Sequence, residues 1–495
     1  MTQAMTRRKR AAAGKILTVS NRGPFEFHRD AAGEIVAEAG TGGLSNALRV
    51  AAQLHPAVWL SSPLTDIDRA IAAKEIAPPP ENNGSAHFVL TDPEQYELFY
   101  GTFANEVLWF LQHGMPWPKD LTLERRRRGR IEGYIPVNKA FAKAIVDEWD
   151  TGEFRAIVIH DYHFYLVPRL VRQQRPEVYL QHFIHIPWPE PKEWARLRNY
   201  TMAEICGGLA ANDSLVFQTP GSAHNFIATC ERFLPGAVTD IEAGTVEFQG
   251  HTTRVWANGI SVDPEELEEA SASPEFSRYR YLLRPERGQK TIVRVDRLDP
   301  TKNVVRGFEA YALLLEKHPE LRDKVSFIAQ LVPSKSDIEI YQRYQYETHS
   351  LASEINRRFG NLHWKPIRVF FEHNRIQGLA AMSLADVLLV NPLADGMNLV
   401  AKEAPMVNMH DGVLVLSKAA GAYAELGCAA IGIDPKDVKG TANALYEALM
   451  MPIEERHERA KRLRAVVRSR DLRDWFRVLL DDIEQNAPSA AISAA

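Results

Sequence analysis

The segment that runs from Asn391 to Glu403 carries residue types suited to binding phosphate and sugar. Its sequence is Asn-Pro-Leu-Ala-Asp-Gly-Met-Asn-Leu-Val-Ala-Lys-Glu, and it follows an apolar run, Asp386–Val390, that we expect to be a buried strand. A helix should begin within the segment, and the free amides of a helix N-terminus attract phosphate. The carboxylates of Asp395 and Glu403 can accept hydrogen bonds from sugar hydroxyls.

A second loop places two cations after another expected strand. Arg297-Leu-Asp-Pro-Thr-Lys302 follows the run Thr291–Val295, and an arginine together with a lysine can clamp a diphosphate. Ligand sites of parallel α/β sheets lie at the carboxyl ends of the strands. Two phosphate-binding loops at strand ends therefore predict a nucleotide-sugar site.

Short apolar strands alternate with helical patterns along the chain, which favours parallel sheets. We expect strands at Ile16–Ser20, Ala156–His160, His182–Ile186, Ser214–Gln218, Thr291–Val295, Lys324–Leu331, Ile367–Phe371, Asp386–Val390, Gly412–Leu416 and Ala430–Ile433. One helical pattern should bury Val304, Phe308, Tyr311, Ala312 and Leu315 on a single face. We predict an α/β fold of two doubly wound domains, with parallel sheets facing a central cleft.

A stretch rich in proline, serine and charge, from about Ser261 to Lys290, predicts the domain boundary. The chain has 495 residues, which suits two or three domains. We expect a disordered tail over residues 1–15, an N-terminal domain over 16–262, a linker over 263–290, a C-terminal domain over 291–470, and a segment over 471–495 whose helix packs back on the N-terminal domain.

Composition and charge narrow the class of protein. Hydrophobic residues make up 45% and charged residues 25% of the chain, as in ordinary globular proteins, and the net charge is -4. This charge gives no general attraction to nucleic acid or to an anionic membrane. Three widely spaced cysteines, Cys206, Cys230 and Cys428, form neither a metal motif nor an even disulfide set, so we expect a reducing cytoplasm. No apolar run approaches the roughly 20 residues that span a bilayer.

Two basic runs need separate interpretation. Arg7–Arg10 is expected to belong to the tail, because Lys15 interrupts the apolar core that a signal peptide needs. Arg125–Arg130 lacks interleaved aromatic residues and any RNA-binding motif, so a solvated or ion-paired segment is expected.

The chain resembles the trehalose-6-phosphate synthases, which are the retaining glycosyltransferases of family 20, over nearly all of residues 16–485. The motifs that carry this resemblance occur in the family's order: Val19-Ser-Asn-Arg22, Thr41-Gly-Gly-Leu44, Tyr100-Gly-Thr-Phe-Ala-Asn-Glu-Val-Leu-Trp109, Ile159-His-Asp-Tyr-His163, His185-Ile-Pro187, Arg297 with Lys302, and Asp395-Gly-Met-Asn-Leu-Val-Ala-Lys-Glu403.

The resemblance implies a GT-B fold and transfer of glucose from a nucleoside-diphosphate glucose to glucose 6-phosphate, giving trehalose 6-phosphate. The N-terminal domain would hold the acceptor and the C-terminal domain the nucleotide. The donor would be UDP-glucose or GDP-glucose, with no metal or other cofactor required. A homo-oligomer is left open.

The resemblance also assigns roles to residues. The catalytic set would be Asp161, His185, Arg297, Lys302 and Asp395. Donor binding would involve Gly43, His185, Arg297, Lys302, Asp395, Gly396, Met397, Asn398, Leu399, Val400 and Glu403. Acceptor binding would involve Arg22, Tyr100, Trp109, Asp161 and Lys335. For Tyr100 and Trp109 the alternative is core packing, and for Asp161 and Asp395 it is helix capping.

Several positions depart from the family pattern. Phe110 replaces a proline, Trp188 replaces a phenylalanine, and Asn303 stands where a glycine often follows the lysine. Lys335 stands where the family usually has arginine, and Ser62 where it has a second tryptophan after Trp59. These departures leave the donor set intact but bear on the acceptor. Asp66-Ile-Asp68 is a metal motif of another transferase class, which we discount because it lies outside the donor half.

Three alternatives remain open from the sequence. Another acceptor, glycerol 3-phosphate or a cyclitol phosphate, would make the chain a glucosylglycerol-phosphate synthase or a pseudo-glycosyltransferase similar to validoxylamine phosphate synthase. A regulatory protein could bind sugar phosphates without turnover. A glycoside hydrolase would need two carboxylates flanking the scissile bond.

Overall fold

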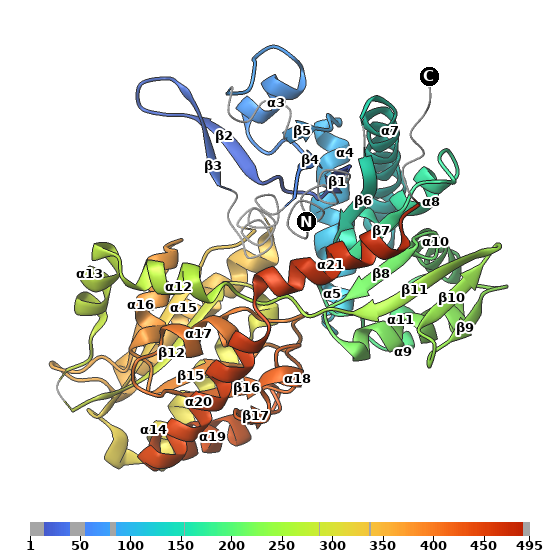
Figure 1. Cartoon of the computed structure of the whole chain (residues 1–495). Helices are drawn as coiled ribbons and strands as arrows, with labels where there is room; N and C mark the ends of the chain where they lie inside the picture. The colour runs from blue at the N-terminus through green and yellow to red at the C-terminus, as the bar shows by residue number, and fades with distance from the viewer. Residues whose placement is uncertain are drawn as a thin grey trace, which may run out of the picture. The chain divides into compact units, whose positions relative to one another are not determined.

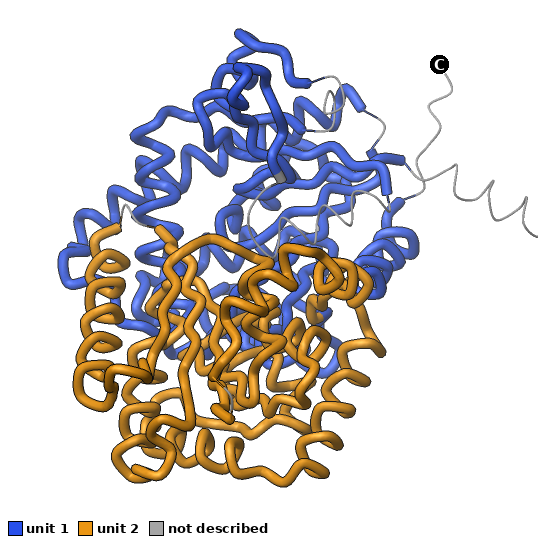
Figure 2. The backbone as a smooth tube through the Cα atoms, turned by 90° about the vertical axis from the view of Figure 1, so that its left-hand side faces the viewer, with its two compact units in different colours: residues 1–258, 473–495 blue, residues 259–472 orange. Residues whose placement is uncertain are grey.

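The structure, a computed structural model, describes residues 14–39, 55–79, 86–152, 154–286, 288–335 and 338–488. It divides into two compact units, coloured separately in Figure 2. Unit 1 comprises Met1–Asn258 and Arg473–Ala495, and unit 2 comprises Gly259–Leu472. The chain therefore passes from one unit to the other twice, at 258/259 and at 472/473.

Unit 1 is built on a mainly parallel sheet. Within the described residues its strand order is β5-β4-β1-β6-β7-β8-β11-β10-β9. The first six strands have the doubly wound order of a Rossmann fold, in which the order reverses between β1 and β6. The strands are β1 Lys15–Val19, β4 Ala57–Ser61, β5 Ala86–Phe88, β6 Phe154–His160, β7 Leu180–Ile184, β8 Ser214–Phe217, β9 Val238–Asp240, β10 Thr245–Phe248 and β11 His251–Ala257, and a separate hairpin pairs β2 Phe25–Arg29 with β3 Ile35–Ala39.

The helices of unit 1 are drawn in blue and green in Figure 1, except for the red C-terminal helix. They are α3 Asp66–Ala72, α4 Pro93–Glu97, η2 Leu98–Leu108, α5 Trp109–Gln112, α6 Leu123–Arg128, η3 Gly129–Tyr134, α7 Ile135–Thr151, η4 Tyr162–Phe164, α8 Val167–Arg172, α9 Pro191–Trp194, α10 Asn199–Leu209, α11 Pro220–Phe233 and α21 Leu472–Asn486. The segment η2 is wound as a π-helix, a geometry that often marks functional sites.

The C-terminal helix α21 packs on the sheet of unit 1, where the sequence predicted a returning helix. Its apolar stripe includes Trp475, Leu479 and Ile483, each at most 3% exposed. The carboxylate of Asp482 accepts hydrogen bonds from Tyr179 Oη (3.1 Å) and Gln181 Nε2 (2.7 Å). This helix thus packs against residues that lie more than 300 positions earlier in the chain.

Unit 2 contains a fully parallel sheet of strand order β14-β13-β12-β15-β16-β17. This is again the Rossmann order, and the reversal lies between β12 and β15. The strands are β12 Lys290–Arg297, β13 Val325–Val332, β14 Ile367–Phe370, β15 Val387–Val390, β16 Val413–Ser417 and β17 Ile431–Ile433. The two Rossmann-like units confirm the predicted α/β fold of GT-B type.

The helices of unit 2 are α12 Pro264–Ser271, α13 Pro274–Leu283, η5 Pro300–Lys302, α14 Val304–Lys317, η6 Pro319–Leu321, α15 Glu339–Phe359, α16 Arg375–Ser383, α17 Val400–Val407, α18 Tyr423–Leu426, α19 Val438–Met450 and α20 Ile453–Ser469. Helix α14 buries Val304, Phe308, Tyr311 and Leu315 as its spacing predicted, whereas Ala312 is only partly buried. These side chains join one apolar core with the strands.

The stretch over residues 263–290 that we expected to be a linker is largely helical. It carries α12, which Asp263 caps through the amides of Glu265 and Glu266, and α13, which Ser273 caps through the amide of Phe276. Both helices belong to unit 2. The prolines and serines that suggested a break are thus helix-start signals, because proline suits the first turn and serine or aspartate suits the N-cap.

The basic run over residues 125–130 is ion-paired, as expected. Arg125 pairs with Glu106 (2.9 Å), and Arg128 pairs with Glu132 (2.8 Å). Arg126 lies over the ring of Trp117, 4.1 Å from its centroid. These arginines therefore make their charge contacts within unit 1. The part of the chain that the structure describes contains no helix long and apolar enough to cross a membrane.

Candidate functional site

The two loops of unit 2 that we expect to bind the donor meet at the point where the strand order reverses. The loop carrying Arg297 and Lys302 follows β12, and the loop carrying Asp395 follows β15, its neighbour in the sheet. At such a point two loops leave the carboxyl edge in opposite directions and open a crevice for a ligand. The fold thus brings together two loops that lie about a hundred residues apart in the sequence.

Lys302 and Asp395 form an ion pair across these loops. The same carboxylate accepts a hydrogen bond from Asn398 Nδ2 at 3.1 Å. Asn398 has a φ of 83° and accepts a hydrogen bond from the amide of Ala401 through its Oδ1 (3.1 Å). Asn398 therefore bonds the first turn of helix α17, whereas the carboxylate of Asp395, for which capping was the alternative considered from the sequence, faces Lys302.

The loop after β15 is held from behind by the backbone that follows β16. The amide of Asp395 donates to the carbonyl of Ala419 (3.2 Å), and the amide of Gly421 donates to the carbonyl of Asp395 (3.0 Å). A Cβ on Gly421 would lie 1.9 Å from the carbonyl oxygen of Gly396. Only glycine permits this approach, so the peptide between Asp395 and Gly396 is clamped in place. Met397 is buried, and Leu399 and Val400 begin α17.

Glu403 lies in the first turn of α17, facing Arg375 at 3.9 Å. Arg375 also pairs with Glu266 at 2.7 Å. Burial raises the pKa of Glu403, an effect that Arg375 partly offsets and the Glu266 carboxylate reinforces. The carboxylate is thus costly to hold in its charged form, which is typical of functional sites.

Arg297 and Lys335 flank the turn of unit 2 that carries Lys302. Arg297 ends β12 with an exposed side chain. Lys335, with a φ of 49°, donates to the hydroxyl of Tyr341 (3.1 Å) and lies 4.0 Å from the Asp299 carboxylate. Asp299 in turn accepts hydrogen bonds from the amide and hydroxyl of Thr301. Lys335 is therefore tied to the same turn that carries Lys302.

In unit 1, Asp161 and His185 meet at the carboxyl ends of β6 and β7. The Asp161 carboxylate accepts a hydrogen bond from the amide of His185 (3.3 Å), and its carbonyl lies 2.9 Å from His182 Nε2. Asp161 has a φ of 70°, a conformation that few non-glycine residues adopt. No side-chain cap bond from Asp161 to η4 is formed, so capping does not account for it.

His185 belongs to a chain of side chains that the sequence did not reveal. Gln218 Nε2 lies 3.1 Å from His185 Nδ1, and His185 Nε2 lies 3.2 Å from His160 Nδ1. An amide donor at Nδ1 leaves the His185 proton on Nε2. Burial lowers the pKa of His160 to about 3 and that of His182 to about 4, so these imidazoles are neutral near pH 7.

The expected acceptor residues of unit 1 are partly brought together. Burial alone would lower the pKa of Arg22, but the Tyr100 phenol and the Glu26 carboxylate raise it. The ring of Tyr100 stacks on His163, with centroids 5.8 Å apart. Trp109 is 7% exposed and packs 5.7 Å from the ring of Tyr162.

Arg22 and Tyr100 therefore form one cluster, and Trp109 packs largely within the core. Gly43 lies outside the described residues.

The discounted motif at Asp66 and Asp68 is structural. The buried carboxylate of Asp68 accepts hydrogen bonds from the amides of Phe27 (3.0 Å), Leu64 (2.9 Å) and Thr65 (2.9 Å). It forms a capping box with Thr65 at the start of α3. Its oxygens are occupied by backbone donors.

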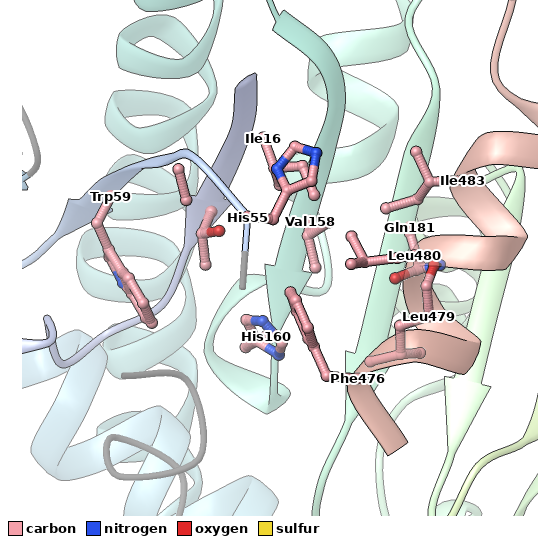
Figure 3. Close-up of a pocket in the computed structure, with 12 residues that line it drawn as sticks. Ile16, His55, Trp59, Val158, His160, Gln181, Phe476, Leu479, Leu480 and Ile483 are labelled. Carbon is pink, nitrogen blue, oxygen red and sulfur yellow. The ribbon is translucent and has the colours of Figure 1, made fainter. Parts of the chain in front are cut away.

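A small apolar cavity lies between α21 and the sheet of unit 1 (Figure 3). In that view Phe476, Leu479 and Ile483 of the helix face Ile16 and Val158 of the strands. Its volume of about 20 Å³ has room for about one water molecule. His160, the neighbour of His185, is among the residues that line it.

The family model described as Glycosyltransferase family 20 matches residues 14–485. An alpha,alpha-trehalose-phosphate synthase (UDP-forming) of Botryotinia fuckeliana is 30% identical over 488 residues, which cover 97% of this chain and 90% of that protein. A bifunctional trehalose-6-phosphate synthase/phosphatase of Thermoproteus tenax is 35% identical over 393 residues, or 77% of this chain. The chain spans about half the length of some relatives, 51% of the Thermoproteus tenax protein and 54% of one from Arabidopsis thaliana.

Two solved structures are similar over almost the whole chain. An E. coli protein bound with UDP-2-fluoro glucose has a TM-score of 0.80 and 26% identity, covering 96% of this chain and all of that one (100%). An alpha,alpha-trehalose-phosphate synthase (UDP-forming) of Burkholderia xenovorans in complex with glucose-6-phosphate has a TM-score of 0.78 and 27% identity, covering 95% and 100%. With the motifs clustered at the two points of strand reversal, these matches establish that the chain belongs to glycosyltransferase family 20.

Proposed function

We propose that this protein is a retaining glycosyltransferase that moves glucose from a nucleoside-diphosphate glucose to glucose 6-phosphate, forming trehalose 6-phosphate. The observation that carries the proposal is the pairing of Lys302 with Asp395 at the strand reversal of unit 2. A cation for the diphosphate and an acceptor of sugar hydroxyl bonds lie side by side there. Relatives of known name and the E. coli structure with a UDP-glucose analogue support the donor class.

On the donor side, Arg297 and Lys302 would bind the diphosphate. Negative charge grows on this group as the bond to the glucose breaks, so fixed cations stabilise the transition state more than the ground state. Asp395 and the amides of Gly396 and Met397 would hold the glucose, and Glu403 would accept bonds from the ribose hydroxyls. This charge compensation comes from the chain itself and calls for no metal ion.

Retention of configuration would follow from attack on the face that the diphosphate leaves. The bond between the glucose C1 and the phosphate oxygen breaks, and the acceptor hydroxyl oxygen forms its bond to C1 on the same face. The departing diphosphate takes the hydroxyl proton. Unlike a double-displacement glycosidase, this route needs no carboxylate nucleophile, and the enzyme contributes positioning and charge stabilisation.

On the acceptor side, Asp161 would orient the attacking hydroxyl, and His185 would contact the donor sugar. Arg22 with Tyr100, and Lys335 from unit 2, would bind the acceptor phosphate, because a phosphate favours an arginine fork and additional donors. The Burkholderia xenovorans complex with glucose-6-phosphate supports this class of acceptor.

A second candidate keeps the donor and changes the acceptor to glycerol 3-phosphate or a cyclitol phosphate. The observation behind it is Ser62, which stands where family members have tryptophan. Its hydroxyl donates to Asn21 Oδ1 (3.1 Å), and Asn21 Nδ2 donates to the Tyr96 hydroxyl (3.2 Å). A polar network thus lies beside Arg22 in place of an indole ring, which would suit a different polyol.

A matrix of donors and acceptors tests both candidates. UDP-glucose and GDP-glucose are each combined with glucose 6-phosphate, glycerol 3-phosphate and a cyclitol phosphate, with and without EDTA. We expect the highest kcat/KM with glucose 6-phosphate and no change with EDTA. No product from glucose 6-phosphate would overturn the leading assignment, and faster turnover of another acceptor would establish the second.

The same matrix addresses the remaining alternatives. A regulatory protein would release no nucleoside diphosphate with any acceptor, and a hydrolase would cleave trehalose without a nucleotide. Lys335→Ala, run in parallel, is expected to raise the KM for phosphorylated acceptors about tenfold or more, since a hydrogen bond to a charged group is lost. An unchanged KM for glucose 6-phosphate would remove Lys335 from the acceptor site.

A further inference from the structure

We propose that Asn303 is a positioning residue of the diphosphate site, which joins the loop of Lys302 to the loop of Asp395. The inference rests on the proposed function, because it assigns Lys302 and Asp395 to the donor. It concerns a residue with no expected contact to the substrate, at a position where the family often has glycine.

The backbone conformation explains why so few residues fit here. Asn303 has φ 60° and ψ 40°, in the left-handed region that L-residues rarely enter. Glycine adopts it freely, and asparagine tolerates it better than most residues. The conformation turns the chain from η5 directly into α14. Glycine would satisfy the turn equally well, so the asparagine side chain needs a reason of its own.

That reason is a set of buried hydrogen bonds to two other loops. Asn303 is 2% exposed, and its Nδ2 donates to the carbonyls of Asn391 (3.0 Å) and Pro435 (2.7 Å). Asn391 Nδ2 returns a bond to the carbonyl of Asn303 at 3.2 Å. One side chain thus joins the loops that follow β12, β15 and β17.

The joint lies immediately beside the paired donor residues. Asn303 is the next residue after Lys302, and Asn391 begins the loop that reaches Asp395. Between these two points the amide of Leu393 donates to the carbonyl of Thr301 at 2.8 Å. A shift of one loop against the other would move the Lys302 ammonium relative to the Asp395 carboxylate. Misplacement of about 1 Å at a reacting centre can cost about a hundredfold in rate.

A buried arginine fixes the same turn from the other side. Arg294, fully buried, donates from Nη2 to Asp296 (2.7 Å) and to the carbonyl of Lys302 (2.9 Å). Gly307 makes room for it, since a Cβ there would lie 2.6 Å from Nη1. With the Lys302 peptide held by Arg294, the side-chain bonds of Asn303 add to the Leu393–Thr301 bond that joins the two loops.

The test compares Asn303→Gly with the wild-type chain, because glycine keeps the backbone conformation and removes only the side-chain bonds. Dissociation constants of UDP and GDP are measured by calorimetry, and KM values for donor and acceptor by initial rates. We expect Asn303→Gly to weaken binding of the preferred diphosphate about tenfold, from the loss of two buried hydrogen bonds. The donor KM should rise in parallel, while the acceptor KM stays within about twofold, since the residues proposed for the acceptor lie outside the loops that follow β12, β15 and β17. Asn303→Asp, which tolerates the turn but would place a buried carboxylate against the same two carbonyl oxygens, should weaken diphosphate binding at least as much as Asn303→Gly.

Asn408→Ala is the matched control. Asn408 is a buried asparagine of unit 2 whose Nδ2 also bonds two carbonyls, those of Met382 and Ala385, both at 2.8 Å. Asn408 precedes β16, and its partners Met382 and Ala385 precede β15, so these bonds lie at the opposite edge of the sheet. This variant should lower the melting temperature without changing the diphosphate affinity.

Two outcomes separate this inference from the function on which it rests. If Lys302→Ala loses diphosphate binding and Asn303→Gly binds within about twofold of wild type, less than one ordinary hydrogen bond is worth, Asn303 is no positioning residue. If Lys302→Ala also retains full affinity for both diphosphates, the proposed donor site itself is wrong.

Discussion

At the residue scale, the donor half is defined by which side chains lie together. Lys302 pairs with Asp395, and Asn398 donates to the same carboxylate. A carboxylate that receives two donors holds its position, and it holds the lysine near the strand reversal where a diphosphate would bind. Arg297 provides a second cation from the end of the preceding strand. The energetic consequence is that charge is arranged before the substrate arrives, which is the main source of electrostatic catalysis.

Removing either cation should therefore reduce catalysis with every acceptor. Arg297→Ala and Lys302→Ala are each expected to lower kcat/KM about 10²–10³-fold, because each removes a charge that we propose to face the leaving diphosphate. Steady-state rates with two or more acceptors provide the measurement. Lys439→Ala, at an exposed position of α19, serves as the control. A loss confined to one acceptor would move the affected cation from the donor to the acceptor site.

The charged, buried carboxylate of Glu403 should destabilise the folded chain to an extent that depends on pH. Burial, which Arg375 only partly offsets, raises the pKa of Glu403 in the folded chain above its unfolded value. The folded state then holds more protons, so the contribution of this group to stability is greatest below the unfolded pKa and is lost as pH rises.

Glu403→Gln should consequently raise the melting temperature at pH 8 by about 2–4 °C, with the difference vanishing near pH 4, while donor KM rises. Thermal scans from pH 4 to 8 measure this. Glu309→Gln, at an exposed position of α14, should change neither quantity. Equal melting temperatures of Glu403→Gln and wild type at pH 8 would show that burial of the charged carboxylate does not destabilise the folded chain.

At the scale of elements, the loops after β12, β15 and β16 form one interlocked unit. Gly421 donates to the carbonyl of Asp395 and leaves no space beside the carbonyl of Gly396. The geometry of the loop that carries Asp395 thus depends on Gly421 having no side chain. Gly421 itself lies in a loop that carries no expected site residue.

Gly421→Ala should disturb that loop without removing any side chain proposed to bind the substrates. The added Cβ, 1.9 Å from the Gly396 oxygen, forces the peptide between Asp395 and Gly396 to move. We expect donor kcat/KM to fall at least about tenfold and stability to fall by about 1–3 kcal/mol, the range for overpacked sites. Gly221→Ala is the control, because an added Cβ meets nothing within 4 Å there. Full activity of Gly421→Ala would show that the loop accommodates the shift.

Apolar runs in the sequence were sufficient to predict most strands of the two large sheets, but they did not predict how the site is supported. Every strand that we expected is present within about two residues, because each is an apolar run that both faces of a sheet bury. Strands such as β9, whose side chains are mostly exposed, lack that signal, and β4 was missed although it is a buried apolar run. The loops of Lys302 and Asp395 were found because motif and topology agree. Their supports were not, since Asn303 and Pro435 lie 132 residues apart and only the fold reveals their contact.

At the scale of the whole molecule, each unit repeats the same plan. Both sheets follow the Rossmann order, and in both the expected site residues follow the strands on either side of the reversal, with Arg22 and Asp161 in unit 1 and Lys302 and Asp395 in unit 2. Unit 1 differs in taking its last helix from the far end of the chain. Helix α21 covers its sheet with Trp475, which is fully buried and contacts the ring of Phe183 edge-on at 5.4 Å.

Trp475→Ala should therefore destabilise unit 1 by about 3–5 kcal/mol, the usual cost of truncating a large buried aromatic residue. Because Trp475 also lies 6.4 Å from the ring of His185, activity should also be reduced at temperatures where the variant is still folded. Differential scanning calorimetry and steady-state rates measure the two effects. Val478→Ala, 37% exposed on the same helix, should alter stability little. A Trp475→Ala chain as stable as wild type would show that α21 is dispensable.

The two passages of the chain between its units have a consequence for recombination. In unit 1, Trp475 Nε1 donates to the carbonyl of Asn258 and Asn258 Nδ2 donates to the carbonyl of Trp475, each at 3.1 Å. In unit 2, the amide of Leu472 donates to the carbonyl of Val262 at 2.9 Å. Within each unit, hydrogen bonds thus join the segment next to 258/259 to the segment next to 472/473. Residues 259–472 form a single uninterrupted segment, so a chimera that is cut at these two points exchanges the whole of unit 2 with that of a relative.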